Sequence, residues 1–281
     1  MDATSTPQSN DIDKKALPEC IVFPARKEHT ATVIISHGLG DTAKNFGRFL
    51  RELKDHSDLG HVKFILPSAP VMSVTGMQGR VMPSWADVYS FDYINRQEDE
   101  DGLMRAVSWI KHLIRIEETE HNIPSKRIII GGLSQGGSIS ILTAITTEKP
   151  LGGLFALSTY VPLRRKILTP HAKNIPILWC HGTGDQLVSI DDWKQLAQTL
   201  AQQLSVPFIT SDYPNDFPAM DQDTSFKNDD DMQNDGGRLH FRSYEGMGHT
   251  IVNEELVEVA AWISRRIPGE PGPSKAGCLL C

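Results

Sequence analysis

Short apolar runs alternate with amphipathic stretches along most of the chain. We expect strands within 31–41, 62–70, 151–158, 174–185 and 239–250, and helices within 43–53, 101–118, 189–204 and 253–266. The segment 127–146, "RIIIGGLSQGGSISILTAIT", combines a strand, a turn and a helix. Strands that are apolar throughout are typical of a parallel sheet that is buried on both faces. The alternation therefore predicts an α/β fold, with a mostly parallel sheet and helices on both of its faces.

The regular pattern leaves two ends and one insertion outside it. We expect residues 1–18 to form a disordered tail, residues 19–267 a single α/β domain, and residues 268–281 a flexible tail rich in proline and glycine. The insertion at about 206–238 contains eight aspartates against one lysine and shows little periodicity. Such a segment can bury little apolar surface, so we expect it to be solvated or disordered.

Charge and cysteine content narrow the class of protein. The formal net charge is −7 at pH 7, whereas nucleic-acid-binding proteins usually carry a basic face, so we expect no nucleic-acid partner. No apolar run approaches the ~20 residues of a membrane-spanning helix, and the polar start lacks the apolar core of a signal peptide. The four cysteines are too few and too scattered for a disulfide framework. These features predict a cytoplasmic protein.

Ser134 lies in the turn between the strand and the helix of 127–146. Residues 132–136, "GLSQG", fit the pattern G-x-S-x-G, in which a strained turn exposes the serine hydroxyl and the glycines let strand and helix pass closely. The N–H of Gln135, where the helix starts, can face a developing oxyanion. The alternative is a glycine-rich turn used only for packing, which the strand–turn–helix context disfavours.

A nucleophilic serine needs a base and an orienting carboxylate. Of the ten histidines, only His37, His181 and His249 directly follow apolar strands. The chain order serine, acid, histidine of the α/β hydrolases selects His249 as the base, and Asp185, after the preceding strand, as the acid.

The second oxyanion donor is expected after an early strand, in "SHGLGD" at 36–41. Glycines on either side of Leu39 let the backbone approach a substrate, so the Leu39 N–H becomes the partner of the Gln135 N–H, and His37 is interpreted as structural. A rival hypothesis gathers His37, His181, His249 and Cys180 around zinc. No spacing such as H-x-x-x-H supports that site, so we expect no metal.

With these residues assembled, the chain resembles the acyl-protein thioesterase and lysophospholipase family, a small carboxylesterase branch of the α/β hydrolases. The resemblance is carried by 37–41, 66–88, 96–103, 131–137, 156–162, 181–185 and 244–249, among them "HGLGD", "GGLSQGG" and "YEGMGH". It implies Ser134 as nucleophile, Asp185 as acid and His249 as base, in agreement with the assignments above. It also implies hydrolysis of acyl thioesters or esters without a cofactor, chiefly of S-palmitoylated proteins and lysophospholipids.

The loop at 71–85 gives this substrate class a physical basis. Flexible apolar side chains there could line an acyl-chain channel, and we single out Met72, Val74, Met82 and Trp85 as substrate-binding candidates. Core packing beneath a long loop explains any one of them equally well. A different class of function is a noncatalytic protein that keeps the scaffold to hold an acyl ligand, and the complete triad argues against it.

The last four residues, "CLLC", fit the prenylation pattern C-a-a-X with Cys278 as the acceptor. A terminal cysteine is not among the commonest residues at the last position, and an unmodified flexible end is the alternative. One lipid chain binds membranes marginally and reversibly, so we expect transient contact with a membrane surface.

Overall fold

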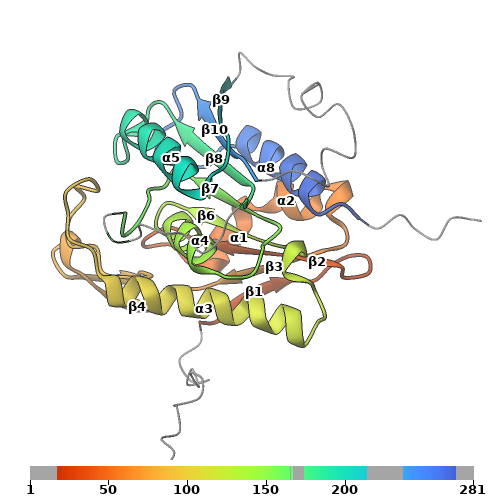
Figure 1. The fold of residues 1–281 in the computed structure, drawn as a ribbon. Coiled ribbons are helices and arrows are strands. Elements are labelled where there is room, and N and C mark those ends of the chain that lie inside the picture. The colour runs from red at the N-terminus through yellow and green to blue at the C-terminus, as the bar shows by residue number, and fades with distance from the viewer. Residues whose placement is uncertain (1–17, 165, 167–173, 214–236, 270–281) are drawn as a thin grey trace, which may run out of the picture.

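The computed structural model describes residues 18–164, 166, 174–213 and 237–269 (Figure 1). Almost all of the two expected tails lies outside the described residues, as does 214–236 of the expected insertion. Within the described ranges no helix is long and apolar enough to cross a membrane.

Eight strands form one sheet through the centre of the molecule (Figure 1). In sheet order they are β1 (Cys20–Phe23), β3 (Val62–Pro67), β2 (Ala31–Ser36), β6 (Ile128–Leu133), β7 (Gly153–Leu157), β8 (Ile177–Gly182), β10 (Leu239–Tyr244) and β9 (Phe208–Tyr213). Only β1 pairs antiparallel, with β3, and the other neighbours pair parallel. The carboxyl ends of the parallel strands therefore meet at one edge of the sheet, where ligands of open α/β sheets bind.

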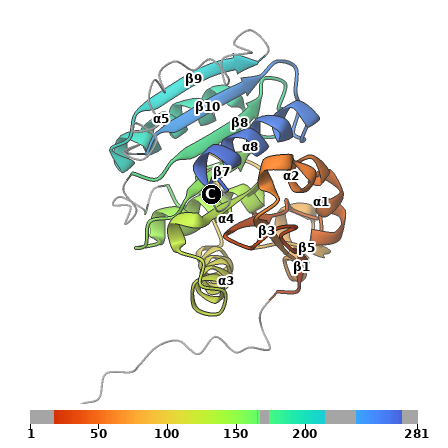
Figure 2. The same ribbon diagram turned by 90° about the vertical axis from the view of Figure 1, so that its right-hand side faces the viewer.

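Helices cover both faces of this sheet (Figures 1 and 2). One face carries α1 (Ala43–Phe49), α2 (Arg51–Asp55) and α8 (Asn253–Arg266), and the other carries α3 (Glu100–Thr119), α4 (Gln135–Thr146) and α5 (Ile190–Leu204). Alternate residues of a strand pack on opposite faces, so Ile34 joins the core under α3 and α4, whereas Val33 and Ile35 join the core under α8. The prediction of an α/β-hydrolase fold is confirmed.

Short elements complete the described chain. They are the single helical turns η2 (Ser57–Leu59), η3 (Thr75–Met77) and η4 (Ser125–Arg127), and the hairpin of β4 (Val71–Val74) with β5 (Arg80–Pro83). The hairpin pairs antiparallel and forms a second, two-stranded sheet.

Two expectations about local structure were wrong. The expected helix 43–53 is divided at Leu50, whose backbone (φ −86°, ψ 16°) leaves the helical region between α1 and α2. The expectation of a solvated or disordered insertion fails for its first part, because residues 208–213 form β9, which pairs with β10. Phe208 packs against the core and the Tyr213 ring stacks on Tyr244 at 5.4 Å, so long-range pairing holds a strand that the local composition did not indicate.

Glu255, in the first turn of α8, is a carboxyl group enclosed by the protein. Its side chain has no exposed surface, and neither carboxyl oxygen has a hydrogen-bond partner among the described residues. Burial raises the pKa of Glu255 to about 8, the nearby Val252 backbone opposes this shift in part, and Glu258 adds a smaller contribution that raises the pKa. The buried group is therefore mostly protonated at neutral pH, and charging it opposes folding.

Glu255→Gln is expected to remove a pH dependence from the stability of the protein. The folded-state pKa of Glu255 lies above the ordinary value of 4.5, so the folded protein favours the protonated carboxyl. The contribution of this preference to the free energy of unfolding is fully present below pH 4.5 and is lost as the pH rises to about 8. Over that pH range the free energy of unfolding of the variant, relative to that of the wild type, should rise by on the order of 4 kcal/mol. Urea unfolding at about pH 5 and about pH 9 measures this gain. Glu254→Gln, an exposed neighbour, is the control, and an equal difference at both pH values would contradict the prediction.

Candidate active site

Three side chains from separate loops meet at the carboxyl edge of the sheet. Ser134 follows β6, Asp185 follows β8 and His249 follows β10. His249 Nε2 lies 2.8 Å from Ser134 Oγ, and His249 Nδ1 lies 2.8 Å from Asp185 Oδ2. The parallel order of the strands explains the meeting, since it places all three loops on the same edge. The arrangement can carry a proton from the serine hydroxyl to the imidazole.

The turn at Ser134 holds a strained backbone. Its φ of 52° and ψ of −119° lie outside the regions that side-chain-bearing residues usually adopt. A Cβ on Gly132 would lie 2.4 Å from the Ser36 carbonyl oxygen, and one on Gly136 would lie 2.2 Å from the same oxygen. Both positions therefore require glycine, and the turn presses the start of α4 against β2. Strain of this kind persists where the surrounding structure enforces it.

The Asp185 carboxylate is enclosed and accepts several hydrogen bonds. Its Oδ1 accepts from the Leu187 and Val188 amides, each at 2.9 Å. Its Oδ2 accepts from His249 and lies 3.4 Å from His181 Nε2. Burial alone raises the pKa of Asp185, but hydrogen bonds from His181, His249 and the Val188 amide outweigh it and hold that pKa well below the usual range. The carboxylate is therefore charged at neutral pH and can stabilise a histidine cation.

The two expected oxyanion donors lie on either side of Ser134. Gln135 is the first residue of α4, so its N–H has no acceptor within the helix. A Cβ on Gly38 would lie 3.6 Å from the Ser134 Cβ, which places the backbone next to Leu39 against the candidate nucleophile. The structure thus brings both peptide segments to the serine, and their role as donors stays a prediction.

The Gln135 side chain makes a buried connection that the sequence analysis did not identify. Its Oε1 accepts from the Trp85 amide at 3.0 Å, and its Nε2 donates to the Ala86 carbonyl at 2.9 Å and to Ser84 Oγ at 3.0 Å. These bonds tie the start of α4 to the end of the 71–85 loop. The residues that make this contact lie in "PSWAD" at 83–87, within the family motif 66–88.

The four substrate-binding candidates divide into two pairs. Met72 and Met82 are half-buried and lie opposite each other in the hairpin, and a Cβ on Gly40 would lie 3.5 Å from Met82 Sδ. Val74 and Trp85 have no exposed surface. Their burial differs from the expectation of a channel lining and matches the core-packing alternative. The sequence of the loop cannot distinguish a channel wall from a core position, because both require apolar side chains.

The residues of the rival zinc hypothesis are engaged elsewhere. His37 bonds the Ala69 amide through Nε2, His181 Nε2 lies 2.8 Å from the Val188 carbonyl oxygen, and Cys180 Sγ lies 3.8 Å from the Tyr244 hydroxyl. Over the described ranges, no three histidine, cysteine or acidic side chains are grouped so that they could hold a metal ion.

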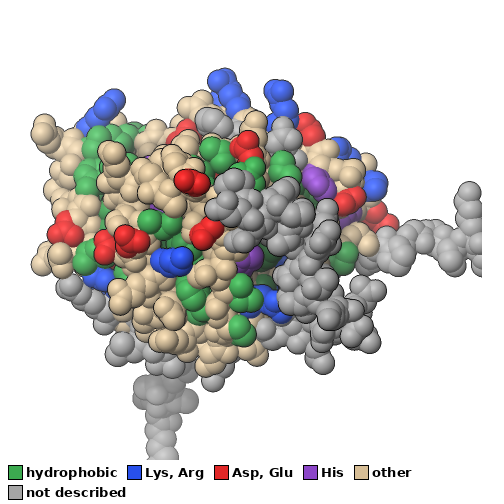
Figure 3. Space-filling view, turned by 90° about the horizontal axis from the view of Figure 1, so that it is seen from above, with side chains coloured by type: hydrophobic (Ala, Val, Ile, Leu, Met, Phe, Trp, Pro, Cys, Tyr) green, Lys and Arg blue, Asp and Glu red, His purple; other side chains and the backbone are tan. Residues whose placement is uncertain are grey.

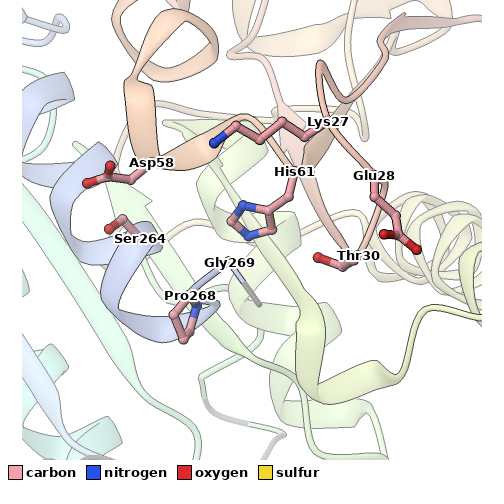
Figure 4. A pocket seen from close by; sticks show the side chains of 8 residues that line it. All are labelled: Lys27, Glu28, Thr30, Asp58, His61, Ser264, Pro268 and Gly269. Atoms are coloured by element: carbon pink, nitrogen blue, oxygen red, sulfur yellow. The ribbon is translucent and has the colours of Figure 1, made fainter. Parts of the chain in front are cut away.

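A pocket of about 430 Å³ has Lys27, Asp58 and Ser264 among its lining residues (Figure 4). Thr30 and His61 line it just before β2 and β3 begin, so it lies at the amino ends of these strands. His61 Nε2 donates to the Ile267 carbonyl at 2.8 Å, which ties this wall to the end of α8. None of the predicted site residues lines it.

Charged side chains are mixed with apolar ones on the face seen in Figure 3. The lysine and arginine side chains visible there lie mostly apart from one another, and acidic side chains lie between them. This distribution differs from the continuous basic stripe of a typical nucleic-acid-binding face.

Comparisons with known proteins relate the chain to one family. The family described as phospholipase/carboxylesterase matches residues 18–227. An acyl-protein thioesterase 1 from Mycosarcoma maydis is 34% identical over 251 residues, covering 86% of this chain and 93% of the relative. An acyl-protein thioesterase 1 from Yarrowia lipolytica is 35% identical over 248 residues, covering 87% of this chain and 96% of the relative. The crystal structure of Arabidopsis thaliana SOBER1 has a TM-score of 0.65 at 29% identity, covering 84% of this chain and 99% of that one. The crystal structure of Zea mays acyl-protein thioesterase 2 has a TM-score of 0.66 at 23% identity, covering 89% of this chain and 99% of that one. This similarity supports the assignment of the fold.

Proposed function

The chain belongs to the phospholipase/carboxylesterase family and is a hydrolase, and we propose that it removes fatty acyl groups from S-acylated cysteines of proteins. The observation that carries this proposal is the continuous hydrogen-bonded chain from Ser134 through His249 to Asp185. The relatives named acyl-protein thioesterase 1 support a thioester of a protein as the substrate.

The first half of the reaction forms an acyl-enzyme. Ser134 Oγ attacks the thioester carbonyl carbon while His249 Nε2, 2.8 Å away, accepts the hydroxyl proton. Asp185 holds the His249 Nδ1–H and stabilises the cation that forms. The N–H groups of Leu39 and Gln135 bind the oxyanion. Collapse of the tetrahedral intermediate breaks the C–S bond, and His249 returns its proton to the departing cysteine sulfur.

The second half releases the fatty acid. His249 takes a proton from water, and the oxygen of that water attacks the acyl carbonyl carbon. Collapse of the second intermediate breaks the bond to Ser134 Oγ, and His249 gives the proton back to that oxygen. Every proton and electron pair is balanced by these groups and water, so the mechanism requires no cofactor.

Met72 and Met82 are the side chains we assign to the acyl chain. They face each other across the hairpin, and Met82 lies beside the backbone of Gly40, next to the proposed oxyanion donor Leu39. Flexible thioether side chains adapt to an alkyl chain at little cost. Val74 and Trp85 have no exposed surface, and we assign them to the core.

Lysophospholipid hydrolysis is the second candidate, favoured by the description of the matched family. We expect kcat/KM for a palmitoylated peptide to exceed that for lysophosphatidylcholine by about tenfold or more, because a thiolate leaves more readily than an alkoxide. Steady-state assays of both substrates on one enzyme preparation test this expectation. A preference for the lysophospholipid would favour the second candidate. If a fluorophosphonate failed to label Ser134, the noncatalytic acyl-binding alternative would replace both.

We further propose a cytoplasmic enzyme that visits membrane surfaces to reach acylated substrates. Lipidation of Cys278 would support such visits, and this residue lies outside the described residues. A hydroxylamine-resistant lipid on the C-terminal peptide, detected by mass spectrometry, would identify prenylation there, whereas palmitate would be released.

A further inference from the structure

His37 directly precedes the peptide that carries the Leu39 N–H. Its side chain has no exposed surface, and its ring makes two hydrogen bonds. Nδ1 lies 2.8 Å from the Gly38 carbonyl oxygen, and Nε2 lies 3.0 Å from the Ala69 nitrogen. A backbone N–H can only donate, so Nε2 is the acceptor. The proton of the neutral ring is therefore on Nδ1, which donates to the Gly38 carbonyl.

Electrostatics favour the same form of the ring. Burial lowers the pKa of His37, while the Gly38 carbonyl and Asp41 oppose the shift with smaller contributions. A protonated ring would carry N–H at both nitrogens and would set a donor against the Ala69 amide. The ring is therefore neutral, with a single tautomer, at neutral pH.

The Gly38 carbonyl controls the direction of the Leu39 N–H. Both groups belong to one planar trans peptide unit, so they point to opposite sides. The carbonyl accepts from His37 Nδ1 and, at 3.3 Å, from the Asp41 amide. The following amide, that of Gly40, donates to the Pro83 carbonyl at 2.8 Å. The Leu39 N–H, held between these anchors, donates to no other residue in the described part of the chain.

His37 is itself held by the segment that contacts Gln135. Trp85 Nε1 donates to the His37 carbonyl at 2.8 Å, and the two rings pack with their centroids 5.2 Å apart. The Trp85 amide donates to Gln135 Oε1 at 3.0 Å. The backbone segments that carry the Leu39 and Gln135 N–H groups are therefore connected through Trp85 and His37.

We propose that His37 is a positioning residue of the oxyanion hole, because its Nδ1–H holds the Gly38 carbonyl so that the Leu39 N–H faces the substrate oxyanion. The inference rests on the proposed function, since it assigns that N–H to an acyl oxyanion. It goes beyond the triad, because His37 acts through a peptide unit and touches no reacting atom.

Two substitutions of His37 separate its two hydrogen bonds. In His37→Asn, the side-chain amide can donate from the position of Nδ1, and the acceptor for Ala69 is lost. In His37→Gln, the amide oxygen can accept from the Ala69 N–H, and the donor to Gly38 is lost. We expect His37→Gln to lower kcat by about 10²-fold with KM within about threefold of the wild type, and His37→Asn to retain at least about tenfold more kcat than His37→Gln.

Inhibition by an alkyl trifluoromethyl ketone distinguishes positioning from loss of structure. This probe adds to Ser134 and places an oxyanion in the hole, so its inhibition constant should weaken in His37→Gln by the same factor as kcat. Thermal unfolding of both variants controls for stability. Equal loss of kcat in both variants, or a loss of kcat without weaker inhibition, would overturn the proposal.

The wild-type protein gives a test that needs no variant to fold. Nitrogen-15 NMR of the histidine rings at neutral pH should show His37 protonated at Nδ1 alone, and protonation at Nε2 would overturn the proposal. Ser134→Ala, assayed beside these variants, separates the two hypotheses. An active Ser134→Ala protein would refute the proposed function, whereas an inactive one with a fully active His37→Gln would refute only the role of His37.

Discussion

Ser134→Ala is expected to lower kcat for thioester hydrolysis by about 10⁶, with little change in KM. The methyl side chain cannot form the acyl-enzyme, and His249 then has no hydroxyl proton to accept. The small remaining rate would come from direct attack of water on the bound substrate, with the oxyanion donors stabilising the intermediate. Stopped or single-turnover assays with a palmitoylated peptide measure the loss.

Ser140→Ala is the matched control for this variant. Ser140 lies in the same helix, α4, and its hydroxyl donates to the Gly136 carbonyl at 3.0 Å. Removal of that hydroxyl should leave kcat close to the wild-type value. His249→Ala should match Ser134→Ala, and the double variant should be no worse than either, because the residues act as a unit. More than about 1% residual kcat in Ser134→Ala would reject the serine as the nucleophile.

The sequence predicted the parts of the fold that depend on local pattern. Apolar runs such as 128–133 and 177–180 identified central parallel strands, because a strand covered on both faces has no polar side. The edge strand β9 was missed because half of its residues are exposed, and its pairing with β10 depends on residues 31 positions away. Edge strands carry a weak pattern, and their existence is decided by long-range hydrogen bonds.

The candidate site was predictable where a position after a strand implied a position in space. Ser134, Asp185 and His249 each follow a strand of the parallel sheet, so topology alone brought them to one edge. The structure places them within hydrogen-bond distance of one another, and their catalytic roles stay a prediction. Glycine spacing likewise indicated that strand and helix pass closely, and a Cβ on Gly132 would lie 2.7 Å from the Gly136 carbonyl carbon. The approach of both glycines to the Ser36 carbonyl of β2 was not predicted.

The side-chain network behind the site was not predictable in the same way. The Gln135 amide bonds to the 84–86 segment across about fifty residues, and His37 bonds Ala69 across thirty-two. The hydrophobic periodicity of the sequence does not predict such contacts, because they depend on how separate loops fold back over the sheet edge. Trp85 illustrates the ambiguity, because an apolar residue in a long loop fits a channel wall and a core position equally well until its burial is known.

Asp185→Asn is expected to lower kcat by about 10⁴, less than the loss of the serine. The amide nitrogen of the variant can donate to His249 Nδ1, which then becomes an acceptor. The imidazole proton moves to Nε2, and that nitrogen can no longer take the proton of Ser134. KM should change little, because Asp185 is buried and is connected to Ser134 only through His249. Asp192→Asn, an exposed carboxylate in the first turn of α5, is the control and should keep full activity.

The same variant tests how strongly the folded protein favours the charged carboxylate. The folded-state pKa of Asp185 lies below the ordinary value of 3.8, so the wild type carries a stabilisation that is fully present above that pH and is lost as the pH falls below it. Asp185→Asn lacks this contribution at every pH. The difference in unfolding free energy between wild type and variant should therefore narrow as the pH falls from about 5 to below about 4, the range in which only the carboxyl groups titrate. Denaturant unfolding along this pH series measures the difference. A difference that stayed constant to low pH would mean that His181, His249 and the Val188 amide do not hold the carboxylate in its charged form.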